Sequence, residues 1–160
     1  MDERALVARQ LGREPRGAWR VSARCSFGSP TVITTSPRLS DGAPFPTLHY
    51  LTCPHLVEAV GRIESEGGVS AWRDRLRDDR ALADRMLAAD RAYRRARATL
   101  ADGSDPTPDA GIAGQGDSLA TKCLHAHVAA FLAGIDDPVG EGVLADLAQE
   151  CDDDRCGKEE

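Results

Sequence analysis

The cysteine thiols are the side chains of this chain best suited to chemistry. Five cysteines occur in 160 residues, and Cys53 stands directly before Pro54, a residue favoured in the first turn of a helix. A thiolate at a helix N-terminus is stabilised by the helix dipole and the free N–H groups. We therefore expect the pKa of Cys53 to lie below the usual ~8.5 and the thiolate to serve as a metal ligand or nucleophile.

A second thiol has an imidazole at helical spacing. Cys123 and His127 are four residues apart in a predicted helix, so their side chains should share one face and could bind one metal ion. Cys25 ends a predicted strand on its inward face. Three cysteines with His127 as a fourth ligand suit zinc, and three cysteines with an open position suit a four-iron cluster. The sequence predicts a zinc or iron–sulfur site formed by Cys25, Cys53 and Cys123.

Two other interpretations of these thiols stay open. Free cysteines are among the most buried residues, and the chain contains no C-x-x-C spacing, so the thiols could be inert core residues. Alternatively, Cys53 or Cys123 could be the nucleophile of an enzyme with His127 as its base. The remaining Cys151 and Cys156 lie in an acidic tail at a spacing that suits no zinc site, and we leave them out of the site.

A glycine-rich segment suggests an anion site near the third thiol. Residues 111–116 read Gly-Ile-Ala-Gly-Gln-Gly and lead into the predicted helix that contains Lys122. Backbone N–H groups at a helix start can hold phosphate or carboxylate, although the Gly-Lys-Ser/Thr ending of a P-loop is absent. Arg24 and Arg38 could add positive charge to an anion pocket with Lys122. The alternatives are a flexible linker and ordinary surface arginines.

A long amphipathic helix offers a different function. Between residues 82 and 100 apolar residues recur at spacings of three and four, which is typical of a helix with one buried face. The other face carries Arg85, Arg91, Arg94, Arg95 and Arg97. Interspersed aspartates favour a solvated face with intrahelical ion pairs. The alternative is a metal-free interaction or regulatory protein whose arginines bind an acidic protein or polyphosphate.

The rest of the pattern predicts how these residues are positioned. A short helix over residues 2–11 precedes a hairpin with strands at 18–25 and 31–35, and a third strand covers 47–52. Helices should begin at Cys53 or Pro54, near Val69, before Leu82, at Asp117 or Ser118, and near Val143. We therefore predict a single α+β domain over residues 1–150, with a small antiparallel sheet of about three strands and several helices packed on one side. Residues 101–117 form an internal Gly/Pro-rich loop, and residues 151–160 form an acidic flexible tail.

Composition excludes several classes of protein. The net charge of −6 makes DNA binding unexpected. No apolar run is long enough to span a membrane, and the charged N-terminus lacks the apolar region of a signal peptide. We therefore expect a cytoplasmic protein, in which an odd number of cysteines stays reduced.

Several of these segments together resemble a known family. They are residues 7–17, Arg24-Cys25, Thr35 to Arg38, 41–48 (Asp-Gly-Ala-Pro-Phe-Pro-Thr-Leu), 51–54 (Leu-Thr-Cys-Pro) and 122–125 (Lys-Cys-Leu-His). From residue 5 to about 147 the chain resembles an uncharacterised actinobacterial family called domain of unknown function 501.

The resemblance implies no established activity. The genes of that family tend to lie beside those for enolase, a septum-formation initiator and an exopolyphosphatase, which points to cell division or phosphate metabolism. The family pattern covers Cys25, Cys53, Cys123 and His127, which strengthens the metal hypothesis. It does not extend to the last two cysteines, and it usually has an aromatic residue where this chain has His49.

Overall fold

The computed structural model describes residues 2–158. Its strands form one antiparallel sheet of three strands in the order β1-β2-β3. The elements in chain order are α1 (Glu3–Leu11), β1 (Trp19–Arg24), β2 (Pro30–Thr35), β3 (His49–Leu51), α2 (Pro54–Ser65), α3 (Gly68–Asp78), α4 (Arg80–Leu100), the short 3₁₀ helix η1 (Ile112–Gly114), α5 (Leu124–Leu132) and α6 (Pro138–Ala145). The predicted α+β class with its small antiparallel sheet is confirmed.

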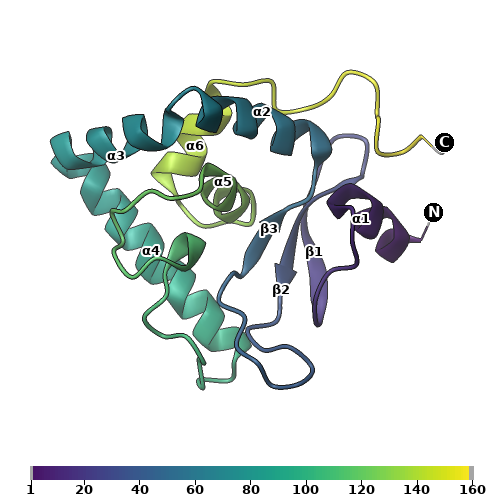
Figure 1. The fold of residues 1–160 in the computed structure, drawn as a ribbon, viewed down its shortest axis with the longest axis horizontal. Coiled ribbons are helices and arrows are strands. Elements are labelled where there is room, and N and C mark those ends of the chain that lie inside the picture. Colours follow the sequence, from purple (N-terminus) through teal and green to yellow (C-terminus); the bar gives the residue numbers. More distant parts are fainter. Residues whose placement is uncertain (1, 159–160) are drawn as a thin grey trace.

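The two faces of the sheet meet different helices. Figure 1 shows α2 to α6 gathered on one side of the sheet and α1 on the other. Side chains alternate between the faces of a strand, and the paired residues Val32 and Leu51 both belong to the main core. On the other face, Gln10 of α1 donates a hydrogen bond to the Pro30 carbonyl oxygen at 2.9 Å.

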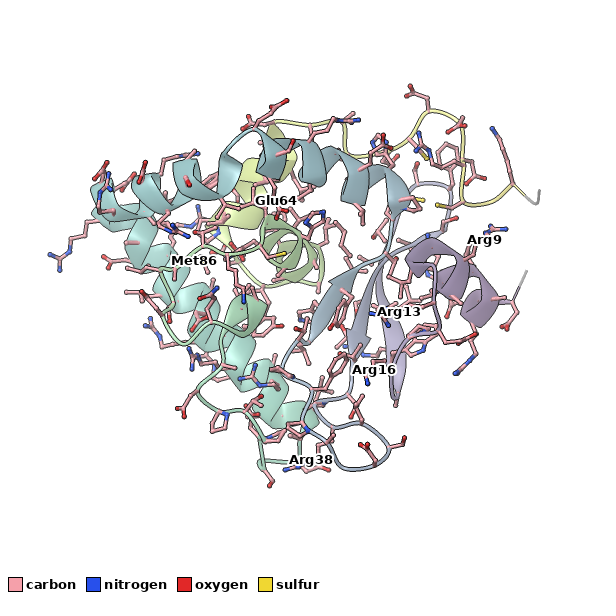
Figure 2. The ribbon with its side chains drawn as sticks, viewed as in Figure 1. Arg9, Arg13, Arg16, Arg38, Glu64 and Met86 are labelled. Carbon is pink, nitrogen blue, oxygen red and sulfur yellow. The ribbon has the colours of Figure 1, made fainter. Side chains whose placement is uncertain are left out.

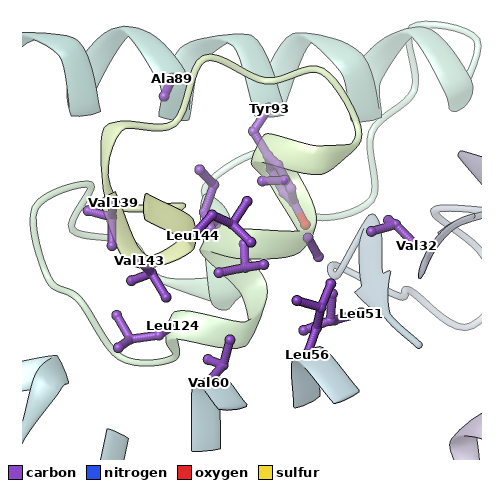
Figure 3. Close-up of a cluster of buried hydrophobic side chains, with 14 of the residues drawn as sticks. Val32, Leu51, Leu56, Val60, Ala89, Tyr93, Leu124, Val139, Val143 and Leu144 are labelled. Atoms are coloured by element: carbon purple, nitrogen blue, oxygen red, sulfur yellow. The ribbon is translucent and has the colours of Figure 1, made fainter. Parts of the chain in front are cut away.

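The main core joins the sheet to the helices around α5. It is built largely from aliphatic side chains (Figure 3), which fits the low aromatic content of 4%. Leu56 and Val60 of α2 belong to the same cluster as Leu124 at the start of α5. Burying one such side chain contributes about 1.5–3 kcal/mol, so these contacts fix α2 against α5.

The helix predicted to contain Cys123 begins later in the structure than the sequence pattern indicates. We expect a helix from Asp117 or Ser118, but α5 begins at Leu124 and has nine residues. The Ser118 hydroxyl donates to the Asp90 carboxylate at 2.7 Å, which ties this segment to α4. Cys123 is therefore the N-cap residue, with extended φ and ψ of −143° and 110°.

The arginines of α4 divide into inward and outward groups. Arg94 donates to the Pro108 carbonyl oxygen at 3.0 Å, and Arg97, at 0% exposure, pairs with Asp105 at 2.9 Å. Both therefore hold the 101–118 segment against α4, while Arg91 and Arg95 are exposed. Neither α4 nor any other helix in the described part of the chain has the length and apolar character needed to cross a membrane.

Candidate metal centre

Three donor side chains meet where α2 packs on the start of α5. Cys123 is the N-cap residue of α5, and His125 follows in its first turn. Glu64, which Figure 2 labels, lies near the end of α2. One donor atom of each residue lies within 4.8 Å of the other two. Within residues 2–158, this is the one group of three or more Cys, His, Asp or Glu side chains that approach so closely.

Hydrogen bonds fix how these groups face one another. The Leu124 N–H donates to Glu64 Oε1 at 2.6 Å, and the same oxygen lies 3.2 Å from His125 Nδ1. The other ring nitrogen, Nε2, lies 3.0 Å from the Val57 carbonyl oxygen. Because a carbonyl oxygen only accepts, Nε2 carries a hydrogen, and Nδ1 faces the carboxylate. That nitrogen therefore needs either a second proton or a cation.

The surroundings of His125 favour a positive charge on its ring. A hydrogen bond with the Cys123 side chain, the Val57 carbonyl and the charge of Glu64 raise the pKa of His125 to about 9, against the opposing effect of burial. In metal-free protein at neutral pH, the ring therefore holds both protons. A metal ion would displace one of them, because a metal-bound imidazole is neutral.

A cavity of about 250 Å³ opens beside the cluster. It is lined by Cys123, His125, Lys122 and Ala126 at the start of α5, and by Tyr50 and Leu51 of β3. A metal ion held by Cys123 and His125 would therefore have one side toward a space large enough for a small molecule.

The predicted metal ligands are not brought together. Cys25 lies in the turn after β1, and Cys53 is 5% exposed at the start of α2. His127 is buried with Nδ1 2.7 Å from Asp137 Oδ2. Cys123 does not share a helical face with His127, because Cys123 precedes the helix in an extended conformation.

The expected activation of Cys53 is wrong. Cys53 does occupy the N-cap of α2 before Pro54, as predicted. Burial nevertheless raises the pKa of the Cys53 thiol, more than the backbone hydrogen bonds of Leu56 and His55 lower it, and the nearby thiols of Cys156 and Cys151 raise it further. The helix dipole is therefore outweighed by desolvation at this position.

The predicted anion-binding residues also lie apart. Arg24 pairs with Glu3 of α1, and Arg38 donates to the carbonyl oxygen of Ser104 at 3.3 Å. Lys122 is the one of the three predicted residues that lines the cavity. The glycine-rich segment contributes to the same wall through Ala113, which has a left-handed φ of 60°.

Sequence reasoning missed two of the three clustered residues. The string Lys-Cys-Leu-His, residues 122–125, contains both Cys123 and His125, and its Cys-x-His spacing was the available signal. Glu64 gave no signal, because it is one of several acidic residues near the end of α2 and lies some 60 positions from Leu124, whose N–H it accepts.

His49, a buried imidazole near the cavity, should make stability depend on pH. Its Nδ1 lies 2.8 Å from the Thr34 hydroxyl, and burial, with a smaller effect from Arg20, lowers the pKa of His49 to about 4. In the unfolded chain His49 binds a proton near pH ~6.5, whereas in the folded protein it stays neutral. The contribution of neutral His49 to the unfolding free energy is therefore complete above that pH and is lost toward pH 4. In wild type, protonation linked to His49 should lower the unfolding free energy by about 2–3 kcal/mol between pH 7.5 and 4.5, and His49→Gln should lack this decrease.

Urea unfolding at several pH values checks this expectation. The test compares how the unfolding free energy changes with pH in wild type and in His49→Gln, so a difference in their absolute stability does not affect it. Parallel curves for wild type and His49→Gln would contradict the buried neutral imidazole.

The fold and the cluster define a small α+β protein with a Glu/Cys/His group beside a cavity. The chain belongs to the family described as "Protein of unknown function (DUF501)", whose sequence profile matches residues 21–145. The resemblance found in the sequence is therefore confirmed. No curated protein and no solved structure matches the chain.

Proposed function

We propose that this protein binds a zinc ion through Cys123, His125 and Glu64. The observation that carries the proposal is the orientation of His125. Its Nε2 is committed to the Val57 carbonyl, and its Nδ1 faces Glu64 Oε1 at 3.2 Å. Two ligands at zinc distances of ~2.0–2.1 Å lie about 3.3 Å apart in a tetrahedral site, so the two atoms already have the required separation. A hydrogen bond from the second ring nitrogen to a carbonyl is also typical of metal-bound histidine.

The donor set supports zinc over an iron–sulfur cluster. One thiolate, one imidazole and one carboxylate are common zinc ligands, whereas iron–sulfur clusters are held mainly by several cysteine thiolates. Only Cys123 supplies a thiol to the cluster within the described residues. Three protein ligands with a fourth position toward a cavity are typical of a catalytic zinc site, where the ion polarises a substrate or activates water.

The same residues suggest a Cys-dependent enzyme as a second candidate. Cys123 lies at a helix N-terminus with its thiol within 4.8 Å of an imidazole nitrogen, a pairing found in enzymes with a cysteine nucleophile. A nucleophile–base–carboxylate relay, however, uses one ring nitrogen for the thiol and the other for the carboxylate. Here one nitrogen is bound to the Val57 carbonyl and the other faces Glu64. The geometry therefore favours chelation.

Metal analysis of protein purified without chelator tests the proposal. We expect about one zinc per chain in wild type and none in Cys123→Ser. Cys25→Ser is the matched control, because Cys25 lies in the β1–β2 turn outside the cluster, and it should keep the metal.

Alkylation of metal-free protein separates the two candidates. Wild type that binds no zinc, with Cys123 alkylated by iodoacetamide faster than the other thiols, would reject the metal site and favour the enzyme. Equal zinc content in wild type and Cys123→Ser would also reject the metal site.

A further inference from the structure

The cavity beside the cluster has an unusual charge for this protein. The chain as a whole has 26 acidic and 20 basic residues, yet no Asp or Glu is found among the described residues that line the cavity. Lys122 lines it, and the ion pairs found within residues 2–158 do not include Lys122. Among the described residues that line the cavity, Lys122 is the one Lys or Arg side chain.

The metal centre would not cancel this charge. The net charge of the cavity rests on the proposed zinc function. A zinc ion with the Cys123 thiolate, the Glu64 carboxylate and neutral His125 forms a group of zero net charge. The Lys122 ammonium then gives the cavity a net positive charge. The N-terminal end of α5, which also borders the cavity, adds the positive end of a helix dipole.

The size and the remaining walls of the cavity limit what it can hold. Apolar surface comes from Leu51, Ala126 and Ala113, and Tyr50, whose ring stacks on Phe45 with centroids 5.8 Å apart, supplies an aromatic side chain. Thr47 and His49 add neutral polar groups to the lining. A cavity of about 150 Å³ is enough for a benzene molecule. The volume here, about 250 Å³, therefore accommodates a body of that size with one further polar group.

We infer that this cavity binds a small organic anion, with its apolar body against β3 and Ala126 and its carboxylate or phosphate on Lys122. The anionic group then lies next to the metal centre, since Lys122 adjoins Cys123 in the chain and both line the cavity. The substrate class of the proposed zinc site is accordingly a small carboxylate or phosphate ester.

Calorimetric titration with benzoate, phenyl phosphate and neutral benzyl alcohol tests this inference. We expect at least one anion to bind wild type at least 10-fold more tightly than benzyl alcohol does. Lys122→Gln should weaken that anion at least 10-fold and leave benzyl alcohol unchanged, and the preferred anion identifies carboxylate or phosphate. Lys158→Gln is the matched control, because the other lysine pairs with Asp153 in the C-terminal segment. Ala126→Leu, which fills the cavity, should weaken all three probes.

The zinc content of the same samples keeps the two proposals separate. Zinc-loaded protein that binds neither anion, or binds it equally well after Lys122→Gln, overturns the inference and leaves the metal site standing. Anion binding that depends on Lys122 in protein unable to bind zinc supports the cavity assignment and rejects the metal centre.

Discussion

Replacing Arg97 with methionine is expected to lower the free energy of unfolding by about 3–5 kcal/mol. The guanidinium is 0% exposed and donates to the Asp105 carboxylate at 2.9 Å and to the carbonyl oxygens of Pro46 and Thr107 at 3.1 and 2.8 Å. Methionine retains much of the apolar stem but leaves a carboxylate and several carbonyl groups without their donor. Unpaired buried polar groups account for most of the expected cost.

Chemical denaturation compares this variant with Arg95→Met. Arg95 is exposed on the same helix, so its replacement should change the unfolding free energy by less than about 0.5 kcal/mol. Similar losses for both variants would mean that Arg97 does not hold the 101–118 segment. A loss confined to Arg97→Met would show that an arginine of the face predicted to be solvated is part of the interior.

The sequence pattern was sufficient for the elements whose signal is local. The period-two run before Cys25 and the β-branched run from Thr31 predict the hairpin, and the structure has strands Trp19–Arg24 and Pro30–Thr35. Pro54 predicts the start of α2, and the apolar spacing predicts α4. Each of these features depends on neighbouring residues, which is why one sequence is enough to find them.

The site depended on contacts that no local pattern contains. The Ser118–Asp90 hydrogen bond joins residues 28 positions apart and accompanies the late start of α5 at Leu124. With that shift, Cys123 becomes an N-cap and loses the shared face with His127 on which the predicted ligand set relied. Glu64 reaches the cluster only because α2 packs on α5. The chemistry of Cys123 was therefore recognisable from the sequence, but its partners were not.

Replacing His125 with alanine is expected to weaken zinc binding by more than about 100-fold. Loss of hydrogen-bonded groups outside the coordination sphere already costs 10–100-fold in metal affinity, and loss of a ligand should cost more. Glu64→Gln should weaken binding less, because the amide keeps an oxygen for the Leu124 N–H and for the metal but loses the negative charge. His55→Ala is the matched control, since His55 contacts the Ala148 carbonyl oxygen and is not in the cluster.

Competition with a chromophoric zinc chelator measures these affinities, and thermal unfolding with and without zinc provides an independent check. A ligand that binds only the folded state adds about 2.7 kcal/mol of stability at a free concentration of 100 times its Kd. Wild type and His55→Ala should show this stabilisation, and His125→Ala at the same zinc concentration should show almost none. Equal stabilisation of all three would place zinc elsewhere on the protein. Stabilisation that follows His125 and Glu64 together would assign it to the junction of α2 and α5, where a change at the metal can reach the core through Leu124 and Val60.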